Sequence, residues 1–149
     1  MKEMLTFKIK MKPEPKQSAK FAAVGKHVRS YQPKKVTDYK QTIQATILSQ
    51  LPDDFVMFGG PIHIDYTFAY APLKSFAKKM LAAVQDDYQM VFKSTKPDAD
   101  NLEKSVNDAM EGIVFNNDSQ IASHRTLKIY EASPYIEIRI KAIDTIVEL

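Results

Sequence analysis

Four runs in which apolar and polar residues alternate constrain the fold of this chain most strongly. A period of two is typical of β-strands with one buried face, and the runs cover residues 5–11, 61–70, 121–131 and 135–143. Apolar residues at helical spacing cover residues 37–50 and 101–112, with a weaker helical pattern within 73–90. The order β-α-β-(α)-α-β-β predicts an α+β fold of two layers, with helices over one face of a four-stranded mixed sheet.

Local signals define the expected ends of these elements. The first long helix is expected to start behind Thr37 and to end before Pro52. Its buried side is expected to carry Tyr39, Ile43, Ile47 and either Ala45 or Leu48. In the later helix, Gly112 stands where a C-terminal cap belongs. Ser133 and Pro134 separate the last two alternating runs, which we therefore expect to pair as a hairpin.

Length and composition exclude several classes of protein. The chain has 149 residues, which is typical of one domain, so we expect a single domain over 1–149 with a basic loop or arm at 13–34 and an excursion at 72–95. The absence of cysteine excludes disulfides, thiolate metal sites and cysteine nucleophiles. No apolar run is long enough for a membrane span or a signal peptide, so we expect a cytoplasmic protein with no membrane partner.

The net charge of +3 is unevenly distributed along the chain. Residues 1–40 hold eleven Lys or Arg against three Asp or Glu, a net +8, and the remainder holds ten against fifteen, a net −5. A basic N-terminal region of this kind indicates a surface that binds polyanions, although lysines that only keep the protein soluble would give the same count. The candidate residues of this polyanion-binding surface are Lys12, Lys16, Lys20, Lys26, Arg29, Lys34 and Lys35.

Three aspartates around the later helix are the candidate metal ligands. Asp98 and Asp100 precede or begin the helix, and Asp118 follows it after a short loop. Asp100 with Glu103 also fits a capping box, which explains Asp100 without a metal but leaves Asp98 unexplained. The three converge if the loop at 115–120 folds back toward the helix start. Gathered carboxylates repel one another unless a cation neutralises them, and an all-oxygen set suits Mg²⁺ or Mn²⁺.

The segment KPDADNLEKSVNDAMEGIVFNNDSQ, residues 96–120, closely resembles the active-site region of RusA-type Holliday-junction resolvases, a group of phage and prophage endonucleases. The family pattern is approximately D-x-D-N-L-x-K, then D-A-L, then a turn ending D-[AS]-Q. Here DAM replaces DAL, and Asn117 stands where many members have a first aspartate. The resemblance implies that the metal-binding carboxylates are Asp98, Asp100 and Asp118, and that the catalytic basic residue is Lys104.

The resemblance also implies an activity and its partners. It implies a Mg²⁺-dependent endonuclease, with Mn²⁺ as a substitute, that acts as a homodimer and resolves four-way junctions by paired symmetric nicks in DNA recombination and repair. Two alternatives stay open: a nuclease for other branched DNA such as flaps and forks, and a non-catalytic DNA-binding protein whose aspartates only cap a helix. For Lys104 the alternative is an ion pair with Asp108 on a solvated helix face.

Overall fold

A computed structural model describes residues 4–16, 20–25, 27–31 and 33–149 of the chain. Its main sheet has five strands in the order β1-β7-β4-β6-β5. Along the chain these are β1 (Leu5–Ile9), β4 (Ile62–Tyr70), β5 (Val91–Phe92), β6 (Ile121–Tyr130) and β7 (Tyr135–Ala142). Strand β4 is parallel to β6 and antiparallel to β7, so the sheet is mixed and the α+β prediction is confirmed.

The prediction of four strands missed β5, and the predicted pairing of the last two strands is wrong. Strand β5 has only two residues, too few for alternation to show in the sequence. Strands β6 and β7 do not pair, because β4 lies between them, with Tyr66 opposite Thr126 on one side and Ile138 on the other. Strand β4 takes the centre because its apolar side chains are almost fully buried, and a central position covers such a strand best.

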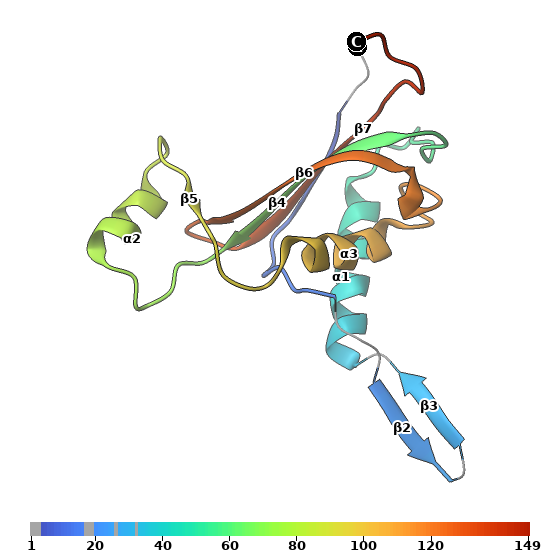
Figure 1. The fold of residues 1–149 in the computed structure, drawn as a ribbon, viewed down its shortest axis with the longest axis horizontal. Helices are drawn as coiled ribbons and strands as arrows, with labels where there is room; N and C mark the ends of the chain where they lie inside the picture. Colours follow the sequence, from blue (N-terminus) through green and yellow to red (C-terminus); the bar gives the residue numbers. More distant parts are fainter. Residues whose placement is uncertain (1–3, 17–19, 26, 32) are drawn as a thin grey trace.

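Two helices cover one face of this sheet (Figure 1). They are α1 (Lys34–Gln50) and α3 (Ala99–Met110), and they contact each other. Helix α1 begins before Thr37, behind Pro33, which fits the start of a helix because its fixed φ is already helical. Its buried residues are Tyr39, Ile43 and Ile47, as predicted, whereas Ala45 and Leu48 are both exposed.

The start of α3 differs from the predicted capping box. The N-cap residue is Asp98 rather than Asp100, and its side chain makes no capping hydrogen bond. Asp100 lies in the first turn, where Oδ1 accepts a hydrogen bond from the backbone N–H of Asn101 at 2.9 Å. Glu103 points toward β6 instead of back toward the helix start. Gly112, with φ of 82°, follows the helix end as predicted.

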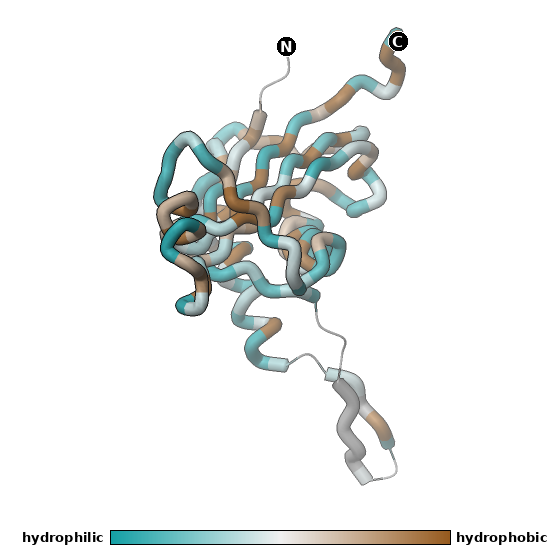
Figure 2. The backbone as a smooth tube through the Cα atoms, turned by 60° about the vertical axis from the view of Figure 1, so that its left-hand side comes forward, coloured by the Kyte–Doolittle hydropathy of each residue, from teal (hydrophilic) through white to brown (hydrophobic). Residues whose placement is uncertain are grey.

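A two-stranded hairpin, β2 (Lys20–Val24) with β3 (His27–Tyr31), projects away from the sheet and helices (Figure 1). The sequence predicted a basic loop or arm here, because no apolar alternation marks the strands. In Figure 2 the hairpin and the C-terminus lie at opposite ends of the molecule. The excursion between β4 and α3 contains a short helix, α2 (Lys78–Gln85). Within the described parts of the chain, no helix is long and apolar enough to cross a membrane.

Candidate active site

The first turns of α3 bring an acidic and a basic candidate together. Asp98, Asp100 and Lys104 are all exposed. The Nζ atom of Lys104 lies 4.0 Å from Oδ2 of Asp100, and both side chains are more than half exposed. The alternative partner of Lys104, Asp108, instead pairs with Lys16 of the N-terminal segment. Lys104 is therefore held beside a candidate metal ligand and remains accessible to a substrate.

Asp118 lies in a short 3₁₀ turn, Asp118–Gln120, just before β6. Its backbone N–H donates to Oε1 of Glu111 at 3.1 Å, and Glu111 is the residue that ends α3. Asn117 caps this turn, because its side-chain oxygen accepts a hydrogen bond from the N–H of Ser119 at 2.8 Å. The asparagine that departs from the family pattern thus has a structural role in shaping the loop that presents Asp118.

The structure does not bring Asp118 to the start of α3. Helix α3 runs antiparallel to β6. The ammonium of Lys128, near the end of β6, donates to the carbonyl oxygen of Pro97, just before the start of α3, at 2.8 Å. Twelve helical residues rise about 18 Å, so Asp98 and the backbone of Asp118 lie at opposite ends of the helix. Among residues 4–16, 20–25, 27–31 and 33–149, no three His, Asp or Glu side chains are arranged to hold a metal ion.

A polar cluster that the sequence did not predict lies between α3 and the sheet. Glu103 accepts hydrogen bonds from the hydroxyl of Thr126 and, at 3.2 Å, from Nδ1 of His124, both on β6. The hydroxyl of Tyr66 on β4 donates to Oδ1 of Asn107 at 2.6 Å. A signal for this cluster exists in the sequence: residues 103 and 107 share one helix face, and residues 124 and 126 share one strand face.

Tyr66 connects this cluster electrostatically with Asp118. Burial raises the pKa of the Tyr66 hydroxyl well above its usual value, and the negative charges of Glu103 and then Asp118 raise it further. Its hydrogen bond to Asn107 acts in the opposite direction. The carboxylates of Glu103 and Asp118 thus both act on the buried hydroxyl of Tyr66.

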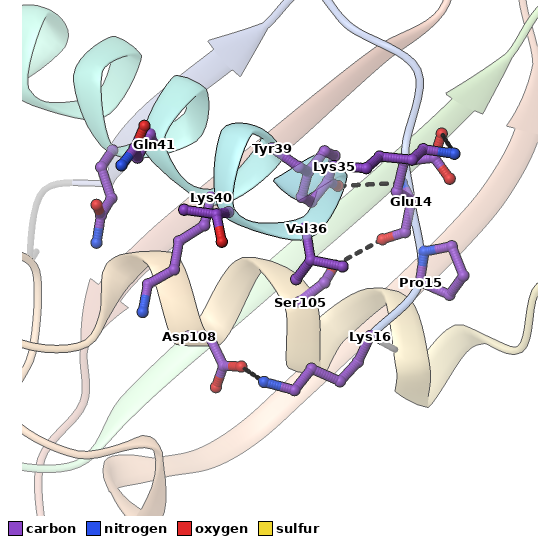
Figure 3. Close-up of a pocket in the computed structure, with 12 residues that line it drawn as sticks. Glu14, Pro15, Lys16, Lys35, Val36, Tyr39, Lys40, Gln41, Ser105 and Asp108 are labelled. Atoms are coloured by element: carbon purple, nitrogen blue, oxygen red, sulfur yellow. Dashed lines mark hydrogen bonds and ion pairs between the residues drawn. The ribbon is translucent and has the colours of Figure 1, made fainter. Parts of the chain in front are cut away.

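The N-terminal segment 13–16 is fixed against both helices (Figure 3). The backbone N–H of Glu14 donates to the hydroxyl of Tyr39 at 3.1 Å, and its carbonyl oxygen accepts from Oγ of Ser105 at 2.8 Å. Lys16 donates its backbone N–H to the carbonyl oxygen of Asn101 at 2.9 Å and pairs its ammonium with Asp108. The segment 13–16, within the basic N-terminal part of the chain, therefore lies directly beside α3.

The other candidate DNA-binding residues lie in the N-terminal segment, in the hairpin and at the start of α1. Lys12 and Lys34 are exposed, and Lys35 lies 3.5 Å from the carboxylate of Glu14. Lys20 and Arg29 lie in the strands of the hairpin, and Lys26 lies outside the described residues. Tyr31, at the end of the hairpin, is 48% exposed, which leaves its ring available to a nucleic acid.

His63 has partners on the sheet face opposite the helices, which the sequence did not reveal. Its Nδ1 atom lies 2.8 Å from Oγ of Ser123, and Nε2 lies 3.0 Å from Oδ1 of Asp65. All three side chains are on the alternate positions of β4 and β6 that point away from α1 and α3. They link two neighbouring strands and are remote from the candidate residues of α3.

Comparisons with known proteins give a family and one relative. The model of a family described as endodeoxyribonuclease RusA matches residues 10–141, which include every strand of the main sheet except β1 and the last residue of β7. An uncharacterized protein of Bacillus subtilis (strain 168), YqaN, is 27% identical over 118 residues, which cover 78% of this chain and 80% of that protein.

Proposed function

Because the chain belongs to the RusA endodeoxyribonuclease family, we propose that it resolves four-way DNA junctions by paired symmetric nicks, in DNA recombination and repair. The family match over residues 10–141 is the observation that carries this proposal. The exposed group of Asp98, Asp100 and Lys104 supports it, because in metal-dependent phosphodiester hydrolysis carboxylates hold the metal ion and a cationic side chain stabilises the charge on the phosphate. With DNA as the substrate, we place the protein in the cytoplasm.

Magnesium is the proposed cofactor, with Mn²⁺ as a substitute. The donor set fits, because Asp98 and Asp100 are exposed oxygen ligands, and Mg²⁺ commonly takes one or two carboxylates with waters and substrate phosphates. The ion would supply positive charge that activates water and neutralises phosphate oxygens. Asp118 is proposed as a third ligand, which requires the loop at 115–120 to approach the helix start when the substrate is bound.

The residues of the chain have separate proposed roles. Lys104 would place its ammonium against the scissile phosphate, where negative charge develops in the transition state. The lysines of the N-terminal segment and of α1 would contact neighbouring phosphates and make the affinity depend on salt. A four-way junction has near two-fold symmetry and two strands to cut, so a symmetric homodimer with two sites fits that geometry.

Cleavage of a synthetic four-way junction in Mg²⁺ or Mn²⁺, beside linear duplex and flap controls, tests this proposal. We expect paired symmetric nicks in the junction strands and weak or no cutting of the controls. Asp100→Asn and Asp118→Asn are each expected to abolish cutting and to retain junction binding. Cutting of flaps or forks in preference to junctions would favour a broader branched-DNA nuclease. Junction binding without cutting, in the presence of either Mg²⁺ or Mn²⁺, would contradict both nuclease hypotheses and favour a non-catalytic DNA-binding protein.

A further inference from the structure

A cleft with a cavity volume of about 690 Å³ opens beside the start of α3. Its walls come from the N-terminal segment around Lys12, from the segment 93–98 before α3, and from the ends of β4 and β6. Asp98 lies in the wall, so the cleft adjoins the candidate active site directly. The volume is within the range of sites that enclose small organic molecules, which gives room for groups of the size of a nucleotide.

The floor of the cleft is aromatic and rigid. Tyr70 and Tyr130 line it, and both are less than one tenth exposed. The hydroxyl of Tyr70 donates to the carbonyl oxygen of Pro13 at 3.2 Å, and the ring of Tyr130 packs edge-on against Phe76 with centroids 4.8 Å apart. These contacts hold the two rings in place at the base of the cleft and give it a partly aromatic lining, which suits the base or sugar of a nucleotide.

The walls of the cleft carry three lysines, Lys12, Lys93 and Lys96, beside the carboxylates of Glu14 and Asp98. No ion pair among the described residues involves Lys12, Lys93 or Lys96. The ammonium of Lys93 lies 5.0 Å from the ring centroid of Tyr70 and 5.4 Å from that of Tyr130, and donates to Oγ1 of Thr95 at 2.7 Å. Phosphate would compete well for it, because an ammonium binds an anion more strongly than a neutral hydroxyl.

A second cavity, of about 510 Å³, lies between the segment 14–16 and helices α1 and α3 (Figure 3). Its charges are largely paired, because Lys16 is bound by Asp108 and Lys35 lies 3.5 Å from Glu14. The cleft beside Asp98 differs in that three of its lysines remain available. Charge therefore favours the larger cleft, not the cavity between the helices, as the site of a phosphate ligand.

We propose that this cleft binds the DNA strand that continues from the scissile phosphodiester. Lys12, Lys93 and Lys96 would contact its phosphates, and a nucleoside would lie over the floor formed by Tyr70 and Tyr130. The strand is unpaired at this point, because a concave pocket with an aromatic floor accepts a nucleotide separated from its partner strand. Lysine contacts and an apolar floor do not select a base, so the cleft positions the strand without reading its sequence.

This inference rests on the proposed nuclease function, and the test separates the two. Junction affinity is measured by fluorescence anisotropy at several salt concentrations in Asp100→Asn, with and without Lys93→Gln and Lys96→Gln together. Each lost phosphate contact on a single strand lowers the salt slope by about 0.7, so we expect a slope shallower by about 1.4 and an affinity on the order of tenfold weaker. Lys79→Gln, an exposed lysine of α2 outside the cleft, is the matched control and is expected to change neither quantity.

Lysine acetylation of the unsubstituted protein, with and without junction DNA, gives a second measurement that does not depend on the folding of a variant. We expect DNA to protect Lys93 and Lys96 and to leave Lys79 reactive, as judged by mass spectrometry. Junction nicking together with an unchanged slope, or with full reactivity of Lys93 and Lys96, would overturn the cleft and leave the nuclease function standing. A protein that neither binds nor nicks junctions would overturn both.

Discussion

The ammonium of Lys104 lies 4.0 Å from the carboxylate of Asp100, one turn back along α3. Both side chains are more than 60% exposed, so the pair contributes little to the free energy of unfolding. The main consequence of the pair is the position of Lys104, because the pair holds its ammonium at the start of α3, beside the candidate metal ligands. A phosphate that approaches Asp100 therefore meets Lys104 as well.

The first prediction concerns this lysine. Lys104→Ala is expected to lower the rate of junction cutting by at least about a hundredfold, the size of effect seen when one group that stabilises transition-state charge is removed. Junction affinity is expected to change by no more than about twofold, because one exposed cation among many supplies little of the binding. Single-turnover cutting and anisotropy titrations measure the two quantities, with Lys79→Ala as the control. Normal cutting at saturating protein with a large loss of affinity would contradict a catalytic role.

A second prediction separates the two aspartates at the start of α3 in metal-free buffer. The Asp98 side chain makes no capping hydrogen bond, and asparagine suits an N-cap position as well as aspartate does, so Asp98→Asn is expected to change the melting temperature less than Asp100→Asn. Asp100 lies in the first turn, where a negative charge complements the helix dipole, and it also pairs with Lys104. Asp100→Asn is expected to destabilise the protein by about 0.5 kcal/mol. Thermal unfolding of both variants measures this, and an equal effect at the two positions would be inconsistent with the observed helix start.

Local spacing predicted the apolar faces of the strands correctly, but not the exact starts of the helices or the burial of Ala45 or Leu48. The apolar stripe of β4, which includes Ile64 and Phe68, is fully buried as its alternation indicated. The hairpin prediction for β6 and β7 failed because strand order depends on which strand is most deeply buried, which local alternation does not encode. Strand β5 and the hairpin β2–β3 were missed because the first is too short and the second carries no apolar alternation.

Local and long-range relationships can be separated in the candidate site as well. The sequence offered Asp108 as the partner of Lys104, whereas the structure pairs Lys104 with Asp100, the other residue four positions away on the helix. The position of Asp118 depends on the direction of β6 relative to α3, a long-range relationship that the sequence left open. The sequence pattern fits Glu103 to a capping box, but two hydrogen-bond donors on β6 bind its carboxylate instead.

A third prediction concerns this polar contact between α3 and β6. Glu103→Ala is expected to cost about 1 to 3 kcal/mol of unfolding free energy, because it leaves the half-buried hydroxyl of Thr126 without its acceptor. Urea unfolding measures the loss, and Glu148→Ala, at an exposed position near the C-terminus, is the matched control. Equal stability of the Glu103 variant and the unsubstituted protein would show that the contact contributes nothing.

The final prediction concerns stability at alkaline pH. Burial is the largest cause that raises the pKa values of Tyr39, Tyr66 and Tyr70 in the folded protein. Below a pH of about 10, the usual pKa of tyrosine, these side chains are protonated in both the folded and the unfolded state, so their contribution to the free energy of unfolding does not change with pH. Above it the unfolded state loses protons that the folded state retains, so the free energy of unfolding falls as pH rises, by about 1.4 kcal/mol per pH unit for each such tyrosine.

Tyr66→Phe tests this relationship at one residue. At pH 8 the variant is expected to be less stable by about 1 kcal/mol, because Asn107 loses its hydrogen-bond donor. Between pH 10 and pH 12 (about two units) its stability is expected to fall less steeply than that of the unsubstituted protein, since one buried hydroxyl no longer resists ionisation. Urea unfolding across this range measures both effects, with Tyr88→Phe as the control because Tyr88 is 97% exposed. Parallel pH profiles for Tyr66→Phe and the unsubstituted protein would contradict the raised pKa, because the two curves must converge if Tyr66 stays protonated in the folded state.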